Sequence, residues 1–269
     1  MRVIAITSGK GGVGKTSLSA NLAIALAGRD QRVAVFDADI GLANLDVMLG
    51  RPAKGTLQEV ISGAKSIADV IEDGPGGIKF VGGGTGIETM ISLTGQAGDA
   101  FLREITELEK TIDFLIFDTG AGIDANVMTF LTAASEVLIV VTPDPASLTD
   151  GYATAKAIIR SDPNVNVKIL MNMVDDEAQS KAVFARLTSI SQQFLGVPLG
   201  YAGYVRVDPK AAKCVRQCKP WILVDPHFPA SRDVDRIAAG LLGEVVAKEA
   251  EIISFSERLR GMFARPRAA

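Results

Sequence analysis

A chain of 269 residues is long enough to form one large α/β domain, and its composition excludes several classes of protein. Hydrophobic residues make up 48% of it and charged residues 22%, which is typical of a globular rather than a disordered protein. The formal net charge of −3 gives no reason to expect non-specific binding to DNA. No apolar run approaches the roughly 20 residues needed to cross a bilayer. The chain also opens on a predicted strand rather than on a secretory leader, so we expect a cytoplasmic protein.

Short runs rich in β-branched residues alternate with longer helical patterns through most of the chain. The predicted strands are residues 2–7, 32–37, 112–118, 136–142, 165–173 and 199–205. The predicted helices are residues 16–27, 100–109, 147–160 and 178–194, and the glycine-rich residues 73–98 are predicted to form a long loop. Several strands are almost continuously apolar, as expected when both of their faces are covered. The pattern predicts an α/β fold with a doubly wound, mostly parallel sheet and helices on both faces.

A glycine-rich segment directly follows the first predicted strand and precedes a predicted helix. Residues 9–16 read Gly-Lys-Gly-Gly-Val-Gly-Lys-Thr, which fits the phosphate-binding pattern G-x-x-x-x-G-K-[ST]. Glycines let backbone N–H groups turn inward on phosphates, and the helix that follows presents its positive end. Lys15 would contact the β- and γ-phosphates, and the Thr16 hydroxyl would ligate Mg²⁺. The sequence therefore predicts a site for ATP and Mg²⁺. The expected nucleotide contacts are Gly11, Gly12, Val13, Gly14, Lys15, Thr16 and Ser17.

Lys10 is unusual, because an ordinary phosphate loop needs no cation at its second position. With Lys10 the loop resembles the deviant Walker A motif, K-G-G-x-G-K-[ST], of the MinD/ParA family of P-loop NTPases, which share their fold with the nitrogenase iron protein. The resemblance implies that Lys10 reaches the nucleotide of a partner subunit, so that ATP binding produces a homodimer. The alternative for Lys10 is a solvated surface side chain.

Carboxylates stand at the ends of two further predicted strands. The second strand ends on Asp37, which is followed by Asp39, and the third ends on Asp118. Carboxylates in this position can hold Mg²⁺ through water or orient an attacking water. By resemblance to the switch regions of the family, Asp39 would position the water, Asp37 and Asp118 would support the metal, and Gly122 would sense the γ-phosphate. Aspartates also cap turns and helices, which is the alternative for Asp37 and Asp39.

The resemblance also implies a base pocket. Asn172, at the end of a predicted strand, matches the family position at which an asparagine amide contacts adenine. Residues 205–209, which include Val207 and Asp208, match a second loop that contacts the base. The implied catalytic residues are thus Lys10, Lys15 and Asp39, and the implied metal-binding residues are Thr16, Asp37 and Asp118.

Within the family the sequence resembles the MinD branch, and inside it the flagellar-number regulators known as FlhG or FleN. The resemblance rests on residues 41–50, 147–152 and 208–220. It implies a slow, Mg²⁺-dependent ATPase that controls the number or placement of flagella through regulatory protein partners. The division-site ATPase MinD is the alternative.

The C-terminal end carries an amphipathic pattern. The apolar residues Ile252, Phe255, Leu259, Met262 and Phe263 fall within an arc of about 100° on a helix. Four arginines and one glutamate between residues 257 and 267 leave this end with a net charge of +3 (4 − 1). We expect a P-loop ATPase domain over residues 1–250 and a membrane-targeting tail over 251–269, with residues 252–265 contacting anionic lipid. The protein would then lie peripherally on the inner face of the cell membrane. The alternative is a C-terminal helix whose apolar stripe packs on the domain.

Two other classes of function stay open. A ParA-like DNA partition ATPase would need a basic strip on its dimer, and the acidic composition argues against DNA as a partner. A metal or iron–sulfur carrier would need thiolates, and Cys214 and Cys218 are the only cysteines. Their spacing differs from the usual C-x-x-C, although two chains could supply four thiolates in a dimer.

Overall fold

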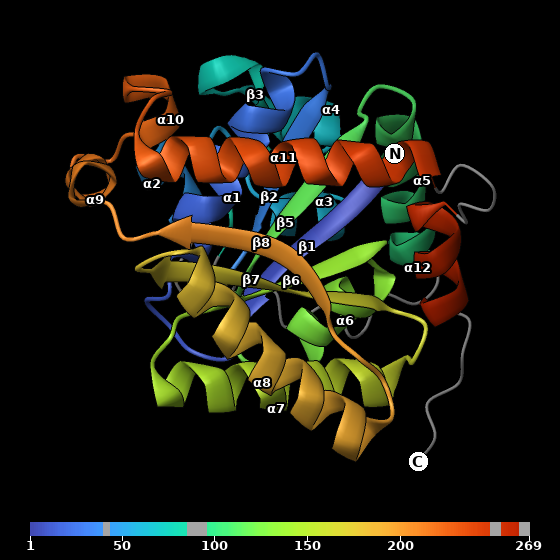
Figure 1. Cartoon of the computed structure of the whole chain (residues 1–269). Coiled ribbons are helices and arrows are strands. Elements are labelled where there is room, and N and C mark those ends of the chain that lie inside the picture. The colour runs from blue at the N-terminus through green and yellow to red at the C-terminus, as the bar shows by residue number, and fades with distance from the viewer. Residues whose placement is uncertain (40–43, 85–95, 248–253, 264–269) are drawn as a thin grey trace.

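The computed structural model describes residues 1–39, 44–84, 96–247 and 254–263, and within them it forms one eight-stranded sheet (Figure 1). The strand order is β3-β4-β2-β5-β1-β6-β7-β8, and every neighbouring pair is parallel except the antiparallel pair β3–β4. The strands are β1 Arg2–Ser8, β2 Val33–Ala38, β3 Glu72–Asp73, β4 Lys79–Val81, β5 Phe114–Ala121, β6 Glu136–Val141, β7 Asn166–Val174 and β8 Gly200–Arg206. The predicted fold class is therefore confirmed.

Helices cover both faces of this sheet. The longer ones are α1 Lys15–Ala27, α5 Gln96–Glu109, α6 Ala125–Ala133, α7 Pro145–Ser161, α8 Glu177–Leu195, α9 Pro209–Arg216, α11 Pro229–Ala247 and α12 Phe255–Phe263. The shorter ones are α2 Leu45–Leu49, α3 Leu57–Ile61, α4 Ile67–Val70, η1 Pro75–Gly77 and α10 Trp221–Val224. None of the described helices combines the length and the apolar character that a membrane span requires.

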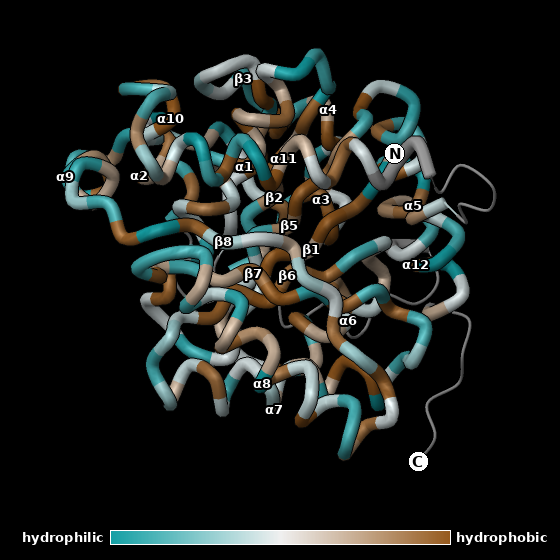
Figure 2. The backbone as a smooth tube through the Cα atoms, in the orientation of Figure 1, coloured by the Kyte–Doolittle hydropathy of each residue, from teal (hydrophilic) through white to brown (hydrophobic). Residues whose placement is uncertain are grey.

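The side-chain alternation of β1 separates two hydrophobic layers. Val3 and Ala5 belong to the layer that packs against α3–α8 and α12, whereas Ile4 and Ile6 belong to the layer beneath α1, α2, α9, α10 and α11. Figure 1 shows α11 crossing one face of the sheet, with α7 and α8 on the other. In Figure 2 the central strands are the most hydrophobic part of the backbone. Burial on both faces explains why these strands are apolar almost without interruption.

The glycine-rich segment differs in part from the predicted loop. Residues 79–81 form β4, which pairs in parallel with β2, and Phe80 and Val81 are completely buried. The prediction of a loop was wrong for these residues, because a three-residue strand between glycines has too short a pattern to be recognised. Residues 85–95 of the predicted loop lie outside the described part of the chain.

The apolar stripe of the C-terminal segment packs on the domain in this structure. Phe255 and Leu259 of α12 are 2% and 0% exposed and belong to the core layer that contains α5 and α6. The Phe255 ring lies 5.6 Å from the ring of Phe117 on β5, measured between centroids. Ser256 donates a hydrogen bond of 2.9 Å to Glu109 of α5. Ile252, the side chain of Phe263 and the predicted boundary at residue 250 lie outside the described part, so the division into two domains stays a prediction.

Candidate nucleotide site

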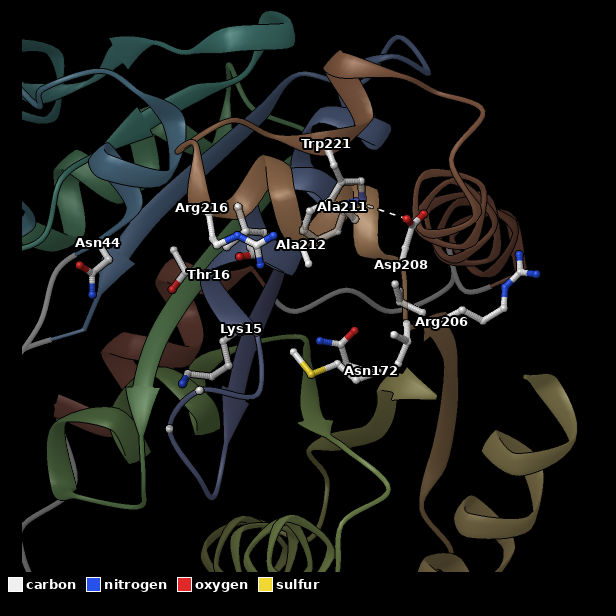
Figure 3. Close-up of a pocket in the computed structure, with 18 of the residues that line it drawn as sticks. Lys15, Thr16, Asn44, Asn172, Arg206, Asp208, Ala211, Ala212, Arg216 and Trp221 are labelled. Atoms are coloured by element: carbon white, nitrogen blue, oxygen red, sulfur yellow. Dashed lines mark hydrogen bonds between the residues drawn. The ribbon is translucent and has the colours of Figure 1, made fainter. Parts of the chain in front are cut away.

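A pocket of about 840 Å³ opens at the carboxyl ends of the central strands (Figure 3). The phosphate loop, the ends of β7 and β8, and helix α9 form its walls. In open parallel sheets this edge is where ligands bind. The predicted residues that line it are Gly11, Gly12, Gly14, Lys15, Thr16, Ser17, Asp39, Asn172, Val207 and Asp208.

The phosphate loop joins β1 to α1 in a conformation that needs its glycines. Gly12 and Gly14 have φ angles of 78° and 93°, in the left-handed region. A Cβ on Gly9 would lie 2.3 Å from the carbonyl oxygen of Asp150. Gly14 is the N-cap of α1 and has no side chain with which to cap it. The first N–H groups of α1 are therefore left for an anion in the pocket.

Lys15 is a buried cation beside carboxylates. Lys15 is only 9% exposed to solvent. Burial lowers the pKa of Lys15, while the nearby charges of Asp118 and Asp39 raise it and thus oppose the effect of burial. The ammonium is short of water and would gain strongly from a phosphate placed against it.

Asp37 and Asp118 lie directly opposite each other on the neighbouring strands β2 and β5. Burial raises the pKa of Asp118 to about 6, and the hydroxyls of Thr16 and Ser19, which bond to this carboxylate, oppose the rise. Burial, with the charge of Asp118 adding to it, raises the pKa of Asp37 to about 7. Two buried carboxylates so close together are best stabilised by a cation between or beside them.

The donor set fits Mg²⁺ of the kind that accompanies a nucleotide. The described residues contain no group of three or more acidic, histidine or cysteine side chains that would form an all-protein cage. Mg²⁺ bound with a nucleotide usually keeps several waters and takes one or two protein oxygens together with phosphate oxygens. The Thr16 hydroxyl, already bonded to Asp118, would be the direct protein ligand, and the carboxylates would act through water. The metal roles of Thr16, Asp37 and Asp118 stay predictions.

Asp37 also organises the segment that follows β2. Its carboxylate accepts hydrogen bonds from the backbone N–H groups of Asp39, Asn44 and Leu45, at 3.0, 3.0 and 3.1 Å. Asp37 thus ties the start of α2 to the end of β2, across residues 40–43, which lie outside the described part. Asp37 therefore caps the start of α2, which is the alternative role considered for it from the sequence. The carboxylate could still interact with a metal, because each of its oxygens has more than one lone pair.

Asp39 lies at the pocket, against the end of β5. A Cβ on Gly120 would be 3.2 Å from Asp39 Oδ1, so a larger residue at 120 would press on this carboxylate. The structure thus brings Asp39, Lys15 and Asp118 into one cluster, as their sequence positions predict. Gly122 does not line the pocket, although its N–H bonds to Ser8 at 3.0 Å and its φ is 111°.

Lys10 does not line the pocket of its own chain. Its ammonium lies 3.4 Å from Asp144 Oδ1, at the N-cap of α7, and both side chains are about half exposed. The Thr142 hydroxyl, the Ser147 N–H and then Lys10 lower the pKa of Asp144 to about 2. Lys10 is therefore paired at the surface, and its contact with a second subunit stays a prediction.

The base end of the pocket is formed by β7, β8 and the loop after β8. The Asn172 amide is 7% exposed and donates to the Val13 carbonyl at 2.7 Å, which fixes it against the phosphate loop. The Asp208 carboxylate accepts N–H bonds from Lys210, Ala211 and Ala230, so it caps α9 and anchors α11. Val207, 57% exposed, offers an apolar side chain at this end.

Sequence reasoning missed one wall of the pocket. Residues outside the predicted set that line it include Asn44, Met173, Ala211, Ala212, Val215, Arg216 and Trp221. Most belong to α9 and α10. The start of α9 is signalled by Asp208-Pro209, a capping residue followed by a proline at the first helical position. That signal predicts a helix, but it does not predict that the helix lines the same pocket as the phosphate loop.

The cysteines are placed apart from the carboxylate cluster. Cys214 is buried on α9 and Cys218 is half-buried just after it. No metal-binding group that includes them is found among the described residues of this single chain.

Comparisons with known proteins agree with this geometry. A family model described as ParA, NUBPL iron-transfer P-loop NTPase, matches residues 1–242. The antiactivator FleN of Pseudomonas aeruginosa is 41% identical over 232 residues, which cover 86% of this chain and 82% of FleN. The flagellum site-determining protein YlxH of Helicobacter pylori is 35% identical over 266 residues, which cover 98% and 89% of the two chains.

Among solved structures, the MinC:MinD cell division protein complex of Aquifex aeolicus contains a similar chain. Its TM-score is 0.74 at 26% identity, over 94% of this chain and 99% of that one. Sequence, fold and phosphate loop thus lead to one family, and the chain belongs to the MinD/ParA family of P-loop ATPases.

Proposed function

We propose that this protein is an ATP-dependent, dimerising switch ATPase that controls the number or placement of flagella. The observation that carries the proposal is the pocket lined by Lys15 and Asp39, with the buried Asp118 beside Lys15, next to a phosphate loop that also contains Lys10. The two flagellar relatives, FleN and YlxH, support the biological assignment. Division-site placement is the second candidate, supported by the likeness to the Aquifex MinD chain.

Each residue of the site has a role that its position supports. Lys15 and the N-terminal N–H groups of α1 would hold the phosphates, and Asn172 with Val207 would hold the base. Asp39 would orient the water that attacks the γ-phosphate. Mg²⁺ bound with the nucleotide would neutralise charge on the phosphate oxygens. Lys10 does not line its own pocket, which supports a role in the site of a second subunit.

The first experiment is a measurement of nucleotide affinity by calorimetry. The wild-type protein should bind ATP and ADP with Mg²⁺, and Lys15→Ala should lose tight binding, because it removes the buried ammonium that would lie against the β- and γ-phosphates. Unchanged ATP affinity in Lys15→Ala would refute the assignment of the pocket.

A second experiment tests dimerisation by light scattering. Asp39→Ala should bind ATP, hydrolyse it poorly and accumulate as a dimer. Lys10→Ala should bind ATP and stay monomeric, because its contact with the partner is lost while the pocket of its own chain is intact. If Lys10→Ala dimerises with ATP like the wild type, the intersubunit role of Lys10 is wrong.

We propose that the C-terminal segment is a reversible membrane anchor, on the strength of its amphipathic sequence, although its apolar stripe is docked on the domain in this structure. In this proposal the apolar stripe is buried in the monomer and becomes available to anionic lipid in the ATP-bound dimer. One short helix would bind weakly, at about 10⁴ M⁻¹, whereas two on one dimer would bind roughly 10²-fold or more tightly. ATP would thus recruit the protein to the inner face of the membrane, and hydrolysis would release it.

The docking contact offers a sharp test that leaves the tail itself unchanged. Glu109 on α5 accepts hydrogen bonds from the Ser256 N–H and hydroxyl, at 3.2 and 2.9 Å. Glu109→Ala should loosen α12 and raise co-sedimentation with anionic vesicles in ADP towards the level in ATP. Glu177→Ala, in a surface pair with Lys181 within α8, is the control and should bind vesicles like the wild type. Equal vesicle binding by the wild type in ATP and ADP would remove the switch from the account.

The remaining candidates are separated by direct assays. A DNA partition ATPase would shift DNA in a salt-dependent manner in the ATP state. A metal carrier would contain iron or zinc bound by Cys214 and Cys218. A pull-down with the ATP-locked Asp39→Ala protein would identify the regulatory partner, and a flagellar or a divisome protein would decide between the two leading candidates.

A further inference from the structure

Arg216 is a cation in the pocket wall to which the nucleotide site described above gives no role. It is the last residue of α9 and lines the pocket together with Ala211, Ala212 and Val215 of the same helix. In Figure 3 the Arg216 side chain lies on the same side of the pocket as Thr16 and Ala212, with Lys15 and Asn172 on the other side. The wall formed by α9 therefore adds a basic side chain to the pocket that contains Lys15.

A hydrogen bond joins α10, which follows α9, to helix α1. The Ile222 N–H, at the beginning of α10, donates to Asn21 Oδ1 at 3.0 Å, and the Asn21 amide donates to the Ser17 carbonyl at 2.7 Å. Trp221, just before Ile222, is 5% exposed and packs in the core layer beneath α1. These contacts fix the segment after Arg216 against the first turns of α1, where Thr16 and Ser17 lie.

The other basic side chains of the pocket are already engaged. Lys15 faces Asp118 and Asp39. The guanidinium of Arg206 forms two bonds to Asp233, at 2.8 and 2.9 Å. Within the described part of the chain, the guanidinium of Arg216 takes part in no hydrogen bond and no ion pair. Arg216 is an exposed cation in the pocket wall without a partner among the described residues, so it is available to an anionic group of the ligand.

We infer that Arg216 contacts the α-phosphate of the bound nucleotide. This inference rests on the proposed ATP site. If Lys15 holds the β- and γ-phosphates and the base lies by Asn172 and Val207, the α-phosphate lies between these ends, at the N-terminus of α1. Arg216 lines the pocket on the side where Thr16, at the N-terminus of α1, also lies, and a guanidinium can bind a phosphate with two parallel hydrogen bonds. Arg216 would thus help to distinguish phosphorylated nucleotides from the free nucleoside.

The test compares Arg216→Gln with Lys213→Gln, which removes the same charge from the same helix at a position that does not line the pocket. Affinities for Mg-ADP, Mg-ATP, AMP and adenosine are measured by competition against a fluorescent ADP. Arg216→Gln should weaken ADP, ATP and AMP by a common factor of about 3 to 10, as expected for one partly exposed charge-assisted contact. Adenosine should be unaffected, and Lys213→Gln should bind all four ligands within about twofold of the wild type.

Two outcomes would overturn the inference. The first is ADP affinity in Arg216→Gln equal to that of the wild type. The second is an equal loss for adenosine, which would place Arg216 at the base or ribose instead. Both differ from failure of the proposed function, in which the wild-type protein itself would not bind ADP. As a further check, the difference between the two proteins should shrink in about 1 M salt, because charges this exposed are screened over about 3 Å there.

Discussion

At the scale of single residues, the site depends on glycines that allow backbone segments to approach closely. Gly9 lies against the backbone of Asp150 in α7, and Gly14 lies against the Asn172 amide, where a Cβ would be 2.6 Å from the amide nitrogen. Gly11, in the same loop, has nothing within 4 Å of the position of a Cβ. The loop therefore contains glycines that the fold requires, among them Gly9 and Gly14, and one, Gly11, that the unliganded fold could replace.

This difference gives a matched pair of variants. Gly9→Ala should lower the free energy of unfolding by about 1–3 kcal/mol, because the new methyl group meets a backbone carbonyl that cannot move aside. Gly11→Ala should leave it within about 0.5 kcal/mol of the wild type. Urea unfolding without nucleotide measures both. If the two variants are equally stable, the close contact between Gly9 and Asp150 is absent in solution.

At the scale of elements, α12 is a docked helix rather than a free tail. Its buried residues belong to the same layer as Phe117, which directly precedes Asp118 on β5. The Arg258 guanidinium also donates to the Ala134 carbonyl at 2.9 Å, so α12 is fixed to the end of α6. Release of this helix would therefore remove packing from β5, the strand that carries Asp118 of the nucleotide site.

The contribution of docking to stability can be measured. Leu259 is completely buried, so Leu259→Ala should cost about 2–4 kcal/mol of unfolding free energy if α12 is docked as described. Gly261→Ala, at a position with nothing within 4 Å, is the control and should leave stability unchanged or raise it by up to about 1 kcal/mol. A free tail would show no loss on Leu259→Ala.

At the scale of the whole molecule, the carboxyl ends and the amino ends of the parallel strands have different roles. The carboxyl edge carries the nucleotide pocket, whereas the amino edge is tied together by a buried ion cluster. Glu136, at the start of β6, bonds to Arg2 of β1 at 2.7 Å and to Lys168 of β7 at 3.0 Å, and its side chain is only 2% exposed. This cluster joins three neighbouring strands at the edge away from the pocket.

Removal of the central carboxylate should therefore affect folding and not binding. Glu136→Ala should cost about 3–5 kcal/mol, because it leaves the buried Lys168 ammonium without this carboxylate. Glu107→Ala, which breaks an exposed pair with Lys110, should cost less than about 1 kcal/mol. Thermal unfolding and ADP calorimetry on the same samples check both effects. A large change in ADP affinity for Glu136→Ala would show that the two edges are coupled.

The sequence by itself determined the elements of the central sheet and the residues of the phosphate loop. The apolar runs that became β1, β5 and β6 are local patterns, and so are the glycines of residues 9–14 and the carboxylates at strand ends. Such features depend on neighbours a few residues away, and parallel strands necessarily bring their carboxyl ends to one edge. This is why the sequence alone predicts that Lys15, Asp39 and Asp118 lie close together.

Only the tertiary structure decided what lies against these elements. The pairing of Lys10 with Asp144, the packing of α10 against α1 and the docking of α12 beside β5 join segments more than 100 residues apart. The amphipathic pattern of α12 is equally suited to a lipid surface and to a protein core, because both provide an apolar environment for one face. Burial of Phe255 and Leu259 selected the core in this structure, since a complementary surface formed by α5, α6 and β5 was available to receive them.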